Sequence, residues 1–125
     1  MATSIKPAAP NKRRQHIEHS QQTILVMRVR TFLPNVICMA VPNGTAVTAP
    51  QRMRLLHEGM LPGAPDLLLF APERPVLAVE MKTETGTVLE AQKRTHEALK
   101  ACAVQVHVCR SADAAWDVVK KWEAG

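Results

Sequence analysis

The sequence predicts an α/β sandwich in which helices cover a mixed, four-stranded sheet. Stretches with apolar residues at helical spacing alternate with short apolar runs rich in β-branched residues. Their order along the chain is helix, strand, short helix, strand, strand, helix, strand, helix. The internal glycines all fall between these segments, where connections are expected: Gly44, Gly59, Gly63 and Gly86. We find no internal repeat and no second domain.

Length and composition are typical of one soluble globular domain. The chain has 125 residues, of which 46% are hydrophobic and 22% charged, so it can bury a modest core without disulfide bonds. No apolar run approaches membrane-spanning length, and the first residues lack a secretory signal. We therefore expect a cytoplasmic protein without membrane contact. Its three cysteines should be reduced and buried: Cys38, Cys102 and Cys109.

The net charge of +5 suggests an anionic partner, nucleic acid first of all. Four of the five net charges come from basic residues within residues 1–14, a stretch of sequence that contains no acid: Lys6, Lys12, Arg13 and Arg14. We expect residues 1–13 to form a flexible basic tail, which either solubilises the chain or binds phosphates, ahead of a domain over residues 14–125. Aromatic residues make up only 3% of the chain, which argues against a stacking platform for single-stranded bases.

Two helices and a strand are predicted in the first half of the chain. Residues 14–31 contain no Gly or Pro, and Pro34 ends this helix. Residues 36–41 are apolar and rich in β-branched side chains, which predicts a buried strand closed by the turn at residues 42–44. Residues 51–58 predict a short helix. Apolar residues recur at roughly helical spacing in the first helix: Ile17, Ile24, Leu25, Met27, Val29 and Phe32.

A hairpin is predicted in the middle of the chain. The turn Pro-Gly-Ala-Pro at residues 62–65 precedes the apolar run at residues 67–70. A second turn at residues 72–75 leads into an apolar strand at residues 76–79, which continues directly into charged residues.

A helix, a strand and a last helix are predicted in the remainder. Thr87 and Glu90 have capping-box spacing and begin a helix that continues to about Lys100. Residues 104–108 predict the fourth strand, and Ser111 can cap the last helix. The side chains expected to face inward from the two helices are Leu89, His96, Leu99, Trp116, Val119 and Trp122.

The triplet Glu80-Met81-Lys82 follows a wholly apolar strand, where charges are out of place. Side chains alternate faces along a strand, so Glu80 and Lys82 share one face while Met81 stays in the core. The turn at residues 72–75 lies at one end of the hairpin, and the opposite end brings Asp66 close to Glu80 and Lys82. Two carboxylates and an ammonium group therefore meet where a buried sheet reaches solvent.

Carboxylates such as Asp66 and Glu80 suit magnesium, which takes one or two carboxylates together with waters and phosphate oxygens. A metal there polarises a phosphodiester and lowers the pKa of a bound water, while Lys82 positions the attacking water and offsets negative charge. The simpler alternative is a solvated ion pair at a strand edge, because acid-x-Lys triplets arise by chance. Glu80-Met81-Lys82 is nevertheless the only such triplet in the sequence.

Residues 59–67 (GMLPGAPDL), residues 80–86 (EMKTETG) and Gln92 together resemble the VRR-NUC family of the PD-(D/E)xK nuclease superfamily. The likeness runs from residue 43 to about residue 119, with a helix ahead of it. Each motif is common alone, whereas Pro65-Asp66 followed by Glu-x-Lys and a downstream Gln is specific. The resemblance implies a restriction-endonuclease-like three-layer sandwich.

The resemblance also implies roles for five residues. Asp66 and Glu80 would bind Mg²⁺, for which Mn²⁺ can substitute, with the Met81 carbonyl as a backbone ligand. Lys82 would be the catalytic lysine, and Gln92 would reach into the site from its helix.

Further residues are candidates at the edge of this site. In this superfamily an acid on the first helix often completes the site, and Glu18 is the only acid there, although it is otherwise a solvated helix residue. His96 follows Gln92 by four residues and could neighbour the site, but packing is the simpler explanation. Four basic residues either track DNA phosphates or form solvated faces: Arg52, Arg54, Lys93 and Arg94.

Stand-alone members of this family are similar to Holliday junction resolvases and form homodimers. The resemblance therefore implies a metal-dependent, structure-selective DNA endonuclease that acts as a homodimer on branched DNA, such as four-way junctions or flaps. A restriction nuclease or an exonuclease is an alternative within the enzyme class. An alternative from another class is a non-catalytic DNA-binding or scaffold subunit that retains the fold. The intact set of Asp66, Glu80, Lys82 and Gln92 favours the enzyme, because an inactive relative is free to lose one of them.

Overall fold

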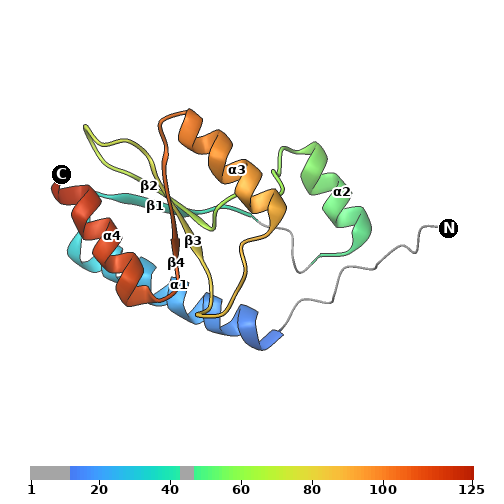
Figure 1. Ribbon diagram of the computed structural model, residues 1–125, viewed down its shortest axis with the longest axis horizontal. Helices are drawn as coiled ribbons and strands as arrows, with labels where there is room; N and C mark the ends of the chain where they lie inside the picture. The colour runs from blue at the N-terminus through green and yellow to red at the C-terminus, as the bar shows by residue number, and fades with distance from the viewer. Residues whose placement is uncertain (1–11, 43–46) are drawn as a thin grey trace.

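A computed structural model of the protein describes residues 12–42 and 47–125, and its elements follow the order expected from the sequence (Figure 1). The elements are α1 (Lys12–Phe32), β1 (Ile37–Ala40), α2 (Ala49–His57), β2 (Leu67–Phe70), β3 (Leu77–Met81), α3 (Glu90–Ala101), β4 (Gln105–Cys109) and α4 (Ala112–Ala124). Most of the predicted tail, and the part of the predicted turn at residues 43–44, lie outside the described residues. None of the described helices has both the length and the apolarity that a membrane crossing requires.

The strands form one sheet in the order β1-β2-β3-β4. β1 pairs antiparallel with β2 and β2 antiparallel with β3, while β3 and β4 are parallel, so the sheet is mixed as predicted. α3 is the crossover that a parallel pair of strands requires. In the β2–β3 hairpin, Leu67 pairs with Val79, so the end of β3 lies beside the residue that precedes β2.

The hydrophobic core lies on one face of the sheet, beneath α1 and α4. Its side chains come from alternate strand positions and from helical positions four residues apart, as the local geometries require. Burial of each large aliphatic side chain contributes about 1.5–3 kcal/mol to stability. The core residues are Leu67, Leu69, Leu77, Val79, Met81 and Cys109 of the sheet, Leu25 and Val29 of α1, and Ala115, Val119 and Trp122 of α4.

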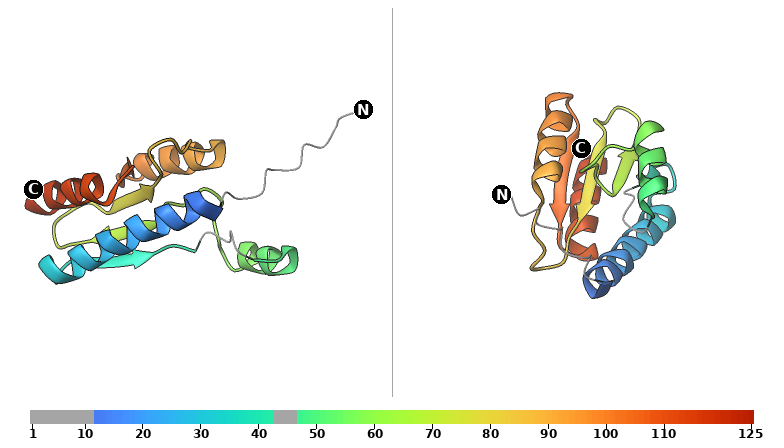
Figure 2. Two further views of the ribbon diagram at one scale, coloured as in Figure 1. Left: turned by 90° about the horizontal axis from the view of Figure 1, so that it is seen from below. Right: turned by 90° about the vertical axis from the view of Figure 1, so that its right-hand side faces the viewer.

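The opposite face of the sheet is covered by α3, so the sandwich has three layers, with α1 and α4 on the other side (Figure 2). α2 connects β1 to β2 and lies at one end of the molecule (Figure 1). The strand positions that face α3 include Ala78 and Glu80, and α3 contributes the buried Thr95 and His96. Because one helix shields this face, a charged side chain can be buried there and still lie close to solvent.

The first strand is more exposed than predicted. β1 is an edge strand, and its Ile37 and Met39 are 59% and 47% exposed. An apolar, β-branched run identifies a strand but does not determine how many neighbours it has in the sheet. The expectation of a buried strand was therefore wrong for this segment.

The ends of α3 also differ from the prediction. The helix begins at Glu90, and its N-cap residue is Leu89 rather than Thr87, with the Leu89 N–H donating to Gln92 Oε1 at 2.9 Å. Leu89 is consequently exposed and does not face inward. Cys102, which was expected to be buried, is exposed as the C-cap residue of α3, while Cys38 is half-buried and Cys109 is buried.

Candidate active site

Asp66 lies at the open end of the β2–β3 hairpin, beside the end of β3. Its Oδ2 accepts a hydrogen bond of 2.7 Å from the Met81 backbone N–H. Its carbonyl accepts a bond of 2.9 Å from the Val41 N–H, which extends the pairing of β1 with β2. Backbone contacts on both sides therefore fix Asp66 at the end of the sheet, where the hairpin predicts it.

Glu80 and Lys82 project from the same face of the sheet, as strand alternation predicts. Glu80 is 3% exposed, and Lys82 Nζ lies 3.9 Å from Glu80 Oε1. Met81 between them lies in the core. The Lys82 N–H donates to the Cys109 carbonyl at 2.9 Å, so β4 supports the backbone of the triplet.

α3 brings two polar side chains to Glu80. Gln92 Nε2 donates to Glu80 Oε1 at 2.8 Å, while Gln92 Oε1 accepts from the Leu89 N–H, so this one side chain both caps the helix and holds the carboxylate. His96 Nε2 lies 3.9 Å from Glu80 Oε2. His96 therefore neighbours the site while being buried against α3's side of the sheet, and its four-residue spacing from Gln92 was the available signal.

The loop before Asp66 packs tightly against the start of α3. Gly63 has φ of +80°, and a Cβ there would collide with the Ala91 carbonyl. Both the backbone conformation and the lack of space therefore favour glycine at this position. Thr95 Oγ1 donates to the Pro62 carbonyl at 2.8 Å. These contacts set the spacing between Asp66 and the side chains of α3.

A cavity of about 250 Å³ opens beside these groups. Its lining includes Asp66, Glu80 and Gln92, together with Glu18 of α1 and Arg52 of α2. Glu18 Oε1 accepts from the Thr83 N–H at 3.4 Å, which places this acid next to the residue that follows Lys82. The fold thus gathers three carboxylates, an amide and a guanidinium from five separate segments.

The other predicted phosphate-contacting residues do not line this cavity. Arg54 forms an ion pair with Glu58 at 2.9 Å, and Lys93 forms one with Glu90 at 3.2 Å. Arg94 is exposed on α3. Of the four basic candidates, Arg52 is the one that the structure brings to the site.

Burial opposes the ionisation of both central carboxyl groups. The pKa of Glu80 is raised to about 8, first by burial and next by the charge of Asp66, against the lowering effect of Lys82. The pKa of Asp66 is also raised, mainly by burial, while its hydrogen bond from Met81 lowers it and the charge of Glu18 raises it. A cation between these groups would reverse the effect, because it stabilises their charged forms.

The donor set fits a hard, partly hydrated divalent cation. Among the residues in 12–42 and 47–125, no three Asp, Glu, His or Cys side chains form a group that could hold a metal by themselves. Magnesium does not require one, because it binds through one or two carboxylates and completes its shell with waters. Asp66 and Glu80 can supply these carboxylates, and Glu80 Oε2 is buried without a hydrogen-bond partner in the described structure.

Arg110 supports the loop after Lys82 and was not identified from the sequence. Its Nη1 donates to the Thr83 carbonyl at 2.9 Å and to the Gly86 carbonyl at 2.6 Å. No motif or spacing points to Arg110, because the contact depends on how β4 is placed beside β3. Its role is to fix the backbone that follows the charged triplet.

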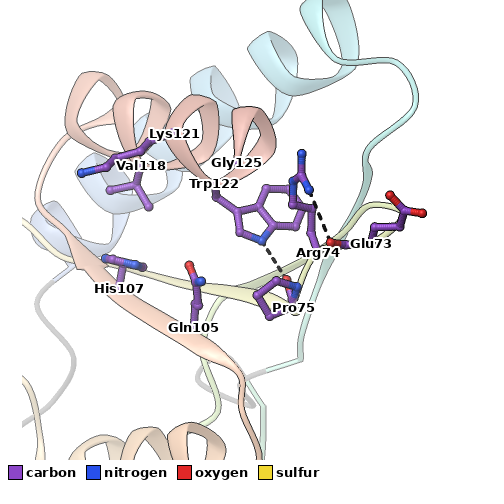
Figure 3. A pocket seen from close by; sticks show the side chains of 9 residues that line it. All are labelled: Glu73, Arg74, Pro75, Gln105, His107, Val118, Lys121, Trp122 and Gly125. Atoms are coloured by element: carbon purple, nitrogen blue, oxygen red, sulfur yellow. Dashed lines mark hydrogen bonds between the residues drawn. The ribbon is translucent and has the colours of Figure 1, made fainter.

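A second, larger cavity of about 520 Å³ lies at the other end of the sheet, between α4 and the turn that joins β2 to β3 (Figure 3). Two of its polar side chains bind backbone carbonyls: the Trp122 indole N–H donates to the Pro75 carbonyl at 2.7 Å, and Arg74 Nε donates to the Glu123 carbonyl at 3.0 Å. Glu73 is the one acidic side chain in its lining. The described lining of the larger cavity therefore lacks a second acidic side chain, whereas the smaller cavity has Asp66 and Glu80 together.

Comparisons with known proteins agree with this architecture. The family model of the VRR-NUC domain matches residues 13–113. A solved structure described as a VRR_NUC domain protein superposes with a TM-score of 0.65 at 17% identity, covering 85% of this chain and 87% of that chain. A second, described as a VRR_NUC domain, has a TM-score of 0.56 at 23% identity and covers 86% and 94% of the two chains. Among curated proteins, none matches.

Proposed function

The chain belongs to the VRR-NUC domain family, which implies a nuclease-type function, and on that premise we propose that it is a magnesium-dependent, structure-selective DNA endonuclease. The observation that carries the proposal is the convergence of Asp66 and Glu80 beside Lys82, next to an open cavity. Charges at the end of a buried strand are costly unless they have partners or a ligand. Their arrangement is the one that phosphodiester hydrolysis with a bound cation requires.

Asp66, Glu80 and the Met81 carbonyl would hold Mg²⁺, or Mn²⁺ as a substitute, and Glu18 would add a third carboxylate. When bound, the cation would neutralise charge on the scissile phosphate and make a water more acidic. This assignment is supported by the oxygen-only donor set, which suits magnesium better than a softer metal.

The remaining side chains orient the reactants. Lys82 positions the attacking water and offsets negative charge as a point cation. Gln92 holds Glu80 in place, and Arg52 binds a non-bridging phosphate oxygen at the edge of the cavity. Water attacks phosphorus directly as the P–O bond to one sugar oxygen breaks; the attacking water loses a proton and the leaving oxygen gains one from solvent. The reaction therefore needs no covalent intermediate with the protein.

Branched DNA is the proposed substrate class, and a homodimer is the proposed assembly. One domain presents one site of this kind, whereas symmetric cutting of two strands at a junction requires two sites related by a two-fold axis. Two copies of this chain satisfy that requirement without any further partner.

The test is cleavage of a panel of end-labelled duplex, nicked, flap and four-way junction DNAs in Mg²⁺ and in EDTA. We expect magnesium-dependent cleavage that is strongest on branched DNA and is abolished by Lys82→Ala, whereas Lys120→Ala on α4 cleaves like the wild type. Circular dichroism should show that Lys82→Ala keeps the wild-type fold. An unchanged rate in Lys82→Ala contradicts the mechanism.

Salt-sensitive DNA binding without cleavage in any divalent ion would instead identify a non-catalytic DNA-binding subunit with the nuclease fold.

A further inference from the structure

Two buried polar atoms face each other without forming a hydrogen bond: Glu80 Oε2 and His96 Nε2 each have no partner among the described residues. They lie 3.9 Å apart, and the side chains are 4% and 6% exposed. Buried polar atoms in folded proteins almost always have partners, because an unpaired one loses its hydrogen bonds to water. Each of these two atoms is therefore a candidate partner of the other.

His96 is the second residue of α3 to reach Glu80. Gln92 donates to Glu80 Oε1 at 2.8 Å, and residues four apart on a helix lie on the same side, one turn above the other. The two side chains therefore approach one carboxylate oxygen each. A carboxylate that is held at both oxygens cannot rotate, whereas one held at a single oxygen can.

We propose that His96 is a positioning residue that orients Glu80 toward its divalent cation, an inference that rests on the proposed function. As a neutral imidazole with its proton on Nε2, His96 donates to Glu80 Oε2 and leaves the second lone pair of that oxygen for the cation. Hydrogen bonds in unliganded active sites are often long and tighten when the ligand binds. The separation of 3.9 Å is consistent with such a contact before metal binding.

Metal titration of three variants separates positioning from packing. His96→Leu fills a similar volume without a donor, His96→Gln returns an amide N–H near the position of Nε2, and His107→Leu removes an exposed histidine of β4 as a control. In DNA-free protein titrated with Mn²⁺ and followed by electron paramagnetic resonance, we expect His96→Leu to bind about ten-fold more weakly, the loss typical when the support of a metal ligand is removed. His96→Gln should stay within about three-fold of the wild type, and His107→Leu should not change. Equal affinities for the Leu and Gln variants overturn the proposal.

Urea unfolding compared in EDTA and in Mn²⁺ tests the same contact without catalysis. The wild type, His96→Leu, Glu80→Gln and the double variant form a cycle in which we expect shifts of the unfolding midpoint that are non-additive in Mn²⁺ and closer to additive in EDTA. Additive shifts in Mn²⁺, with Mn²⁺ binding to the wild type intact, overturn the role of His96 alone. A wild type that binds no Mn²⁺ overturns the proposed function and this inference together.

Discussion

Glu80 is a buried acid whose surroundings have opposite effects on its pKa. Burial and the charge of Asp66 favour the neutral form, while Lys82 favours the charged one. The Gln92 amide holds one oxygen of the carboxyl group whichever form it takes. Since burial and the charge of Asp66 outweigh Lys82, ionisation of Glu80 is costly, and a bound cation would reduce that cost.

That cost predicts how stability depends on pH. The pKa of Glu80 is raised to about 8 from an ordinary value of 4.5, so between these values the folded protein keeps a proton that the unfolded chain has lost. The free energy of unfolding should therefore fall as pH rises through this window. The pKa of His96 is lowered from 6.5, mainly by burial, so His96 changes the stability mainly below pH 6.5. Glu80 should dominate the change between pH 6.5 and pH 8.

We expect urea unfolding in EDTA to show a loss of roughly 1–2 kcal/mol between pH 6.5 and pH 8. Glu80→Gln has no charge to gain and should lose less than half as much. Magnesium at pH 8 should restore the wild type. Stability that rises with pH in the wild type, or an equal loss in Glu80→Gln, would contradict this account of Glu80.

At the scale of single elements, α3 organises the site more than any other helix. Its start packs against the loop at Gly63, Thr95 anchors the Pro62 carbonyl, and Gln92 holds Glu80. The hairpin places Asp66 and Glu80 near each other, and α3 fixes their relative positions. A change at the contact between loop and helix should therefore affect catalysis as well as stability.

Gly63→Ala and Gly59→Ala form a matched pair that tests this contact. Both glycines have positive φ, but a Cβ at Gly63 meets the Ala91 backbone while one at Gly59 has open space. Gly59→Ala should cost about 1–2 kcal/mol of unfolding free energy from backbone strain alone and keep normal cleavage. Gly63→Ala should cost about 2–4 kcal/mol in total, because steric overlap adds to the strain, and should lower the cleavage rate measured where both variants are folded. Equal effects on stability and on cleavage would argue against a packing role for Gly63.

α2 offers a second comparison within one element. Arg52 lines the cavity, whereas Arg54 forms an ion pair with Glu58. Binding to fluorescently labelled junction DNA can be measured in Ca²⁺ over a series of salt concentrations. Arg52→Ala should weaken this binding. It should also reduce the slope of log affinity against log salt by about one, which corresponds to the loss of one phosphate contact. Arg54→Ala should leave the slope unchanged. If Arg54→Ala reduced the slope and Arg52→Ala did not, Arg54 rather than Arg52 would be the residue of α2 that contacts DNA.

At the scale of the whole molecule, the two faces of the sheet have different roles. One face carries the hydrophobic core beneath α1 and α4, and the other carries Glu80 beneath α3. Three apolar residues of α1 are exposed among polar ones: Ile17, Ile24 and Met27, at spacings of seven and three, are 40%, 39% and 63% exposed. Apolar residues that recur on the outside of a helix favour contact with another chain.

The proposed homodimer should therefore depend on α1. Sedimentation equilibrium of the wild type should give about twice the chain mass of 13.8 kDa. Met27→Asp should shift the protein toward monomer, because a charge in an apolar contact is costly. Met53→Asp on α2, where Met53 is 53% exposed, serves as the control and should remain dimeric. A wild type that sediments as a monomer would contradict the dimer.

Local patterns in the sequence were sufficient for the order of elements and for the centre of the site. Alternation along β3 predicts that Glu80 and Lys82 share a face, and the two turns predict the hairpin that brings in Asp66, because both follow from backbone geometry over a few residues. The structure places all three as predicted. The same local patterns misjudged β1, Leu89 and Cys102, whose exposure depends on what lies beside them.

Only the tertiary structure decided which distant side chains reach this centre. Glu18 and Arg52 line the cavity, and His96 lies against Glu80, because α1, α2 and α3 pack as they do around the end of the sheet. Arg54 was as good a candidate as Arg52 by residue type and position, yet it forms its ion pair elsewhere. The physical reason is one of range: alternation and turn geometry act between neighbours in the chain, while contacts between elements are set by packing that no short segment encodes.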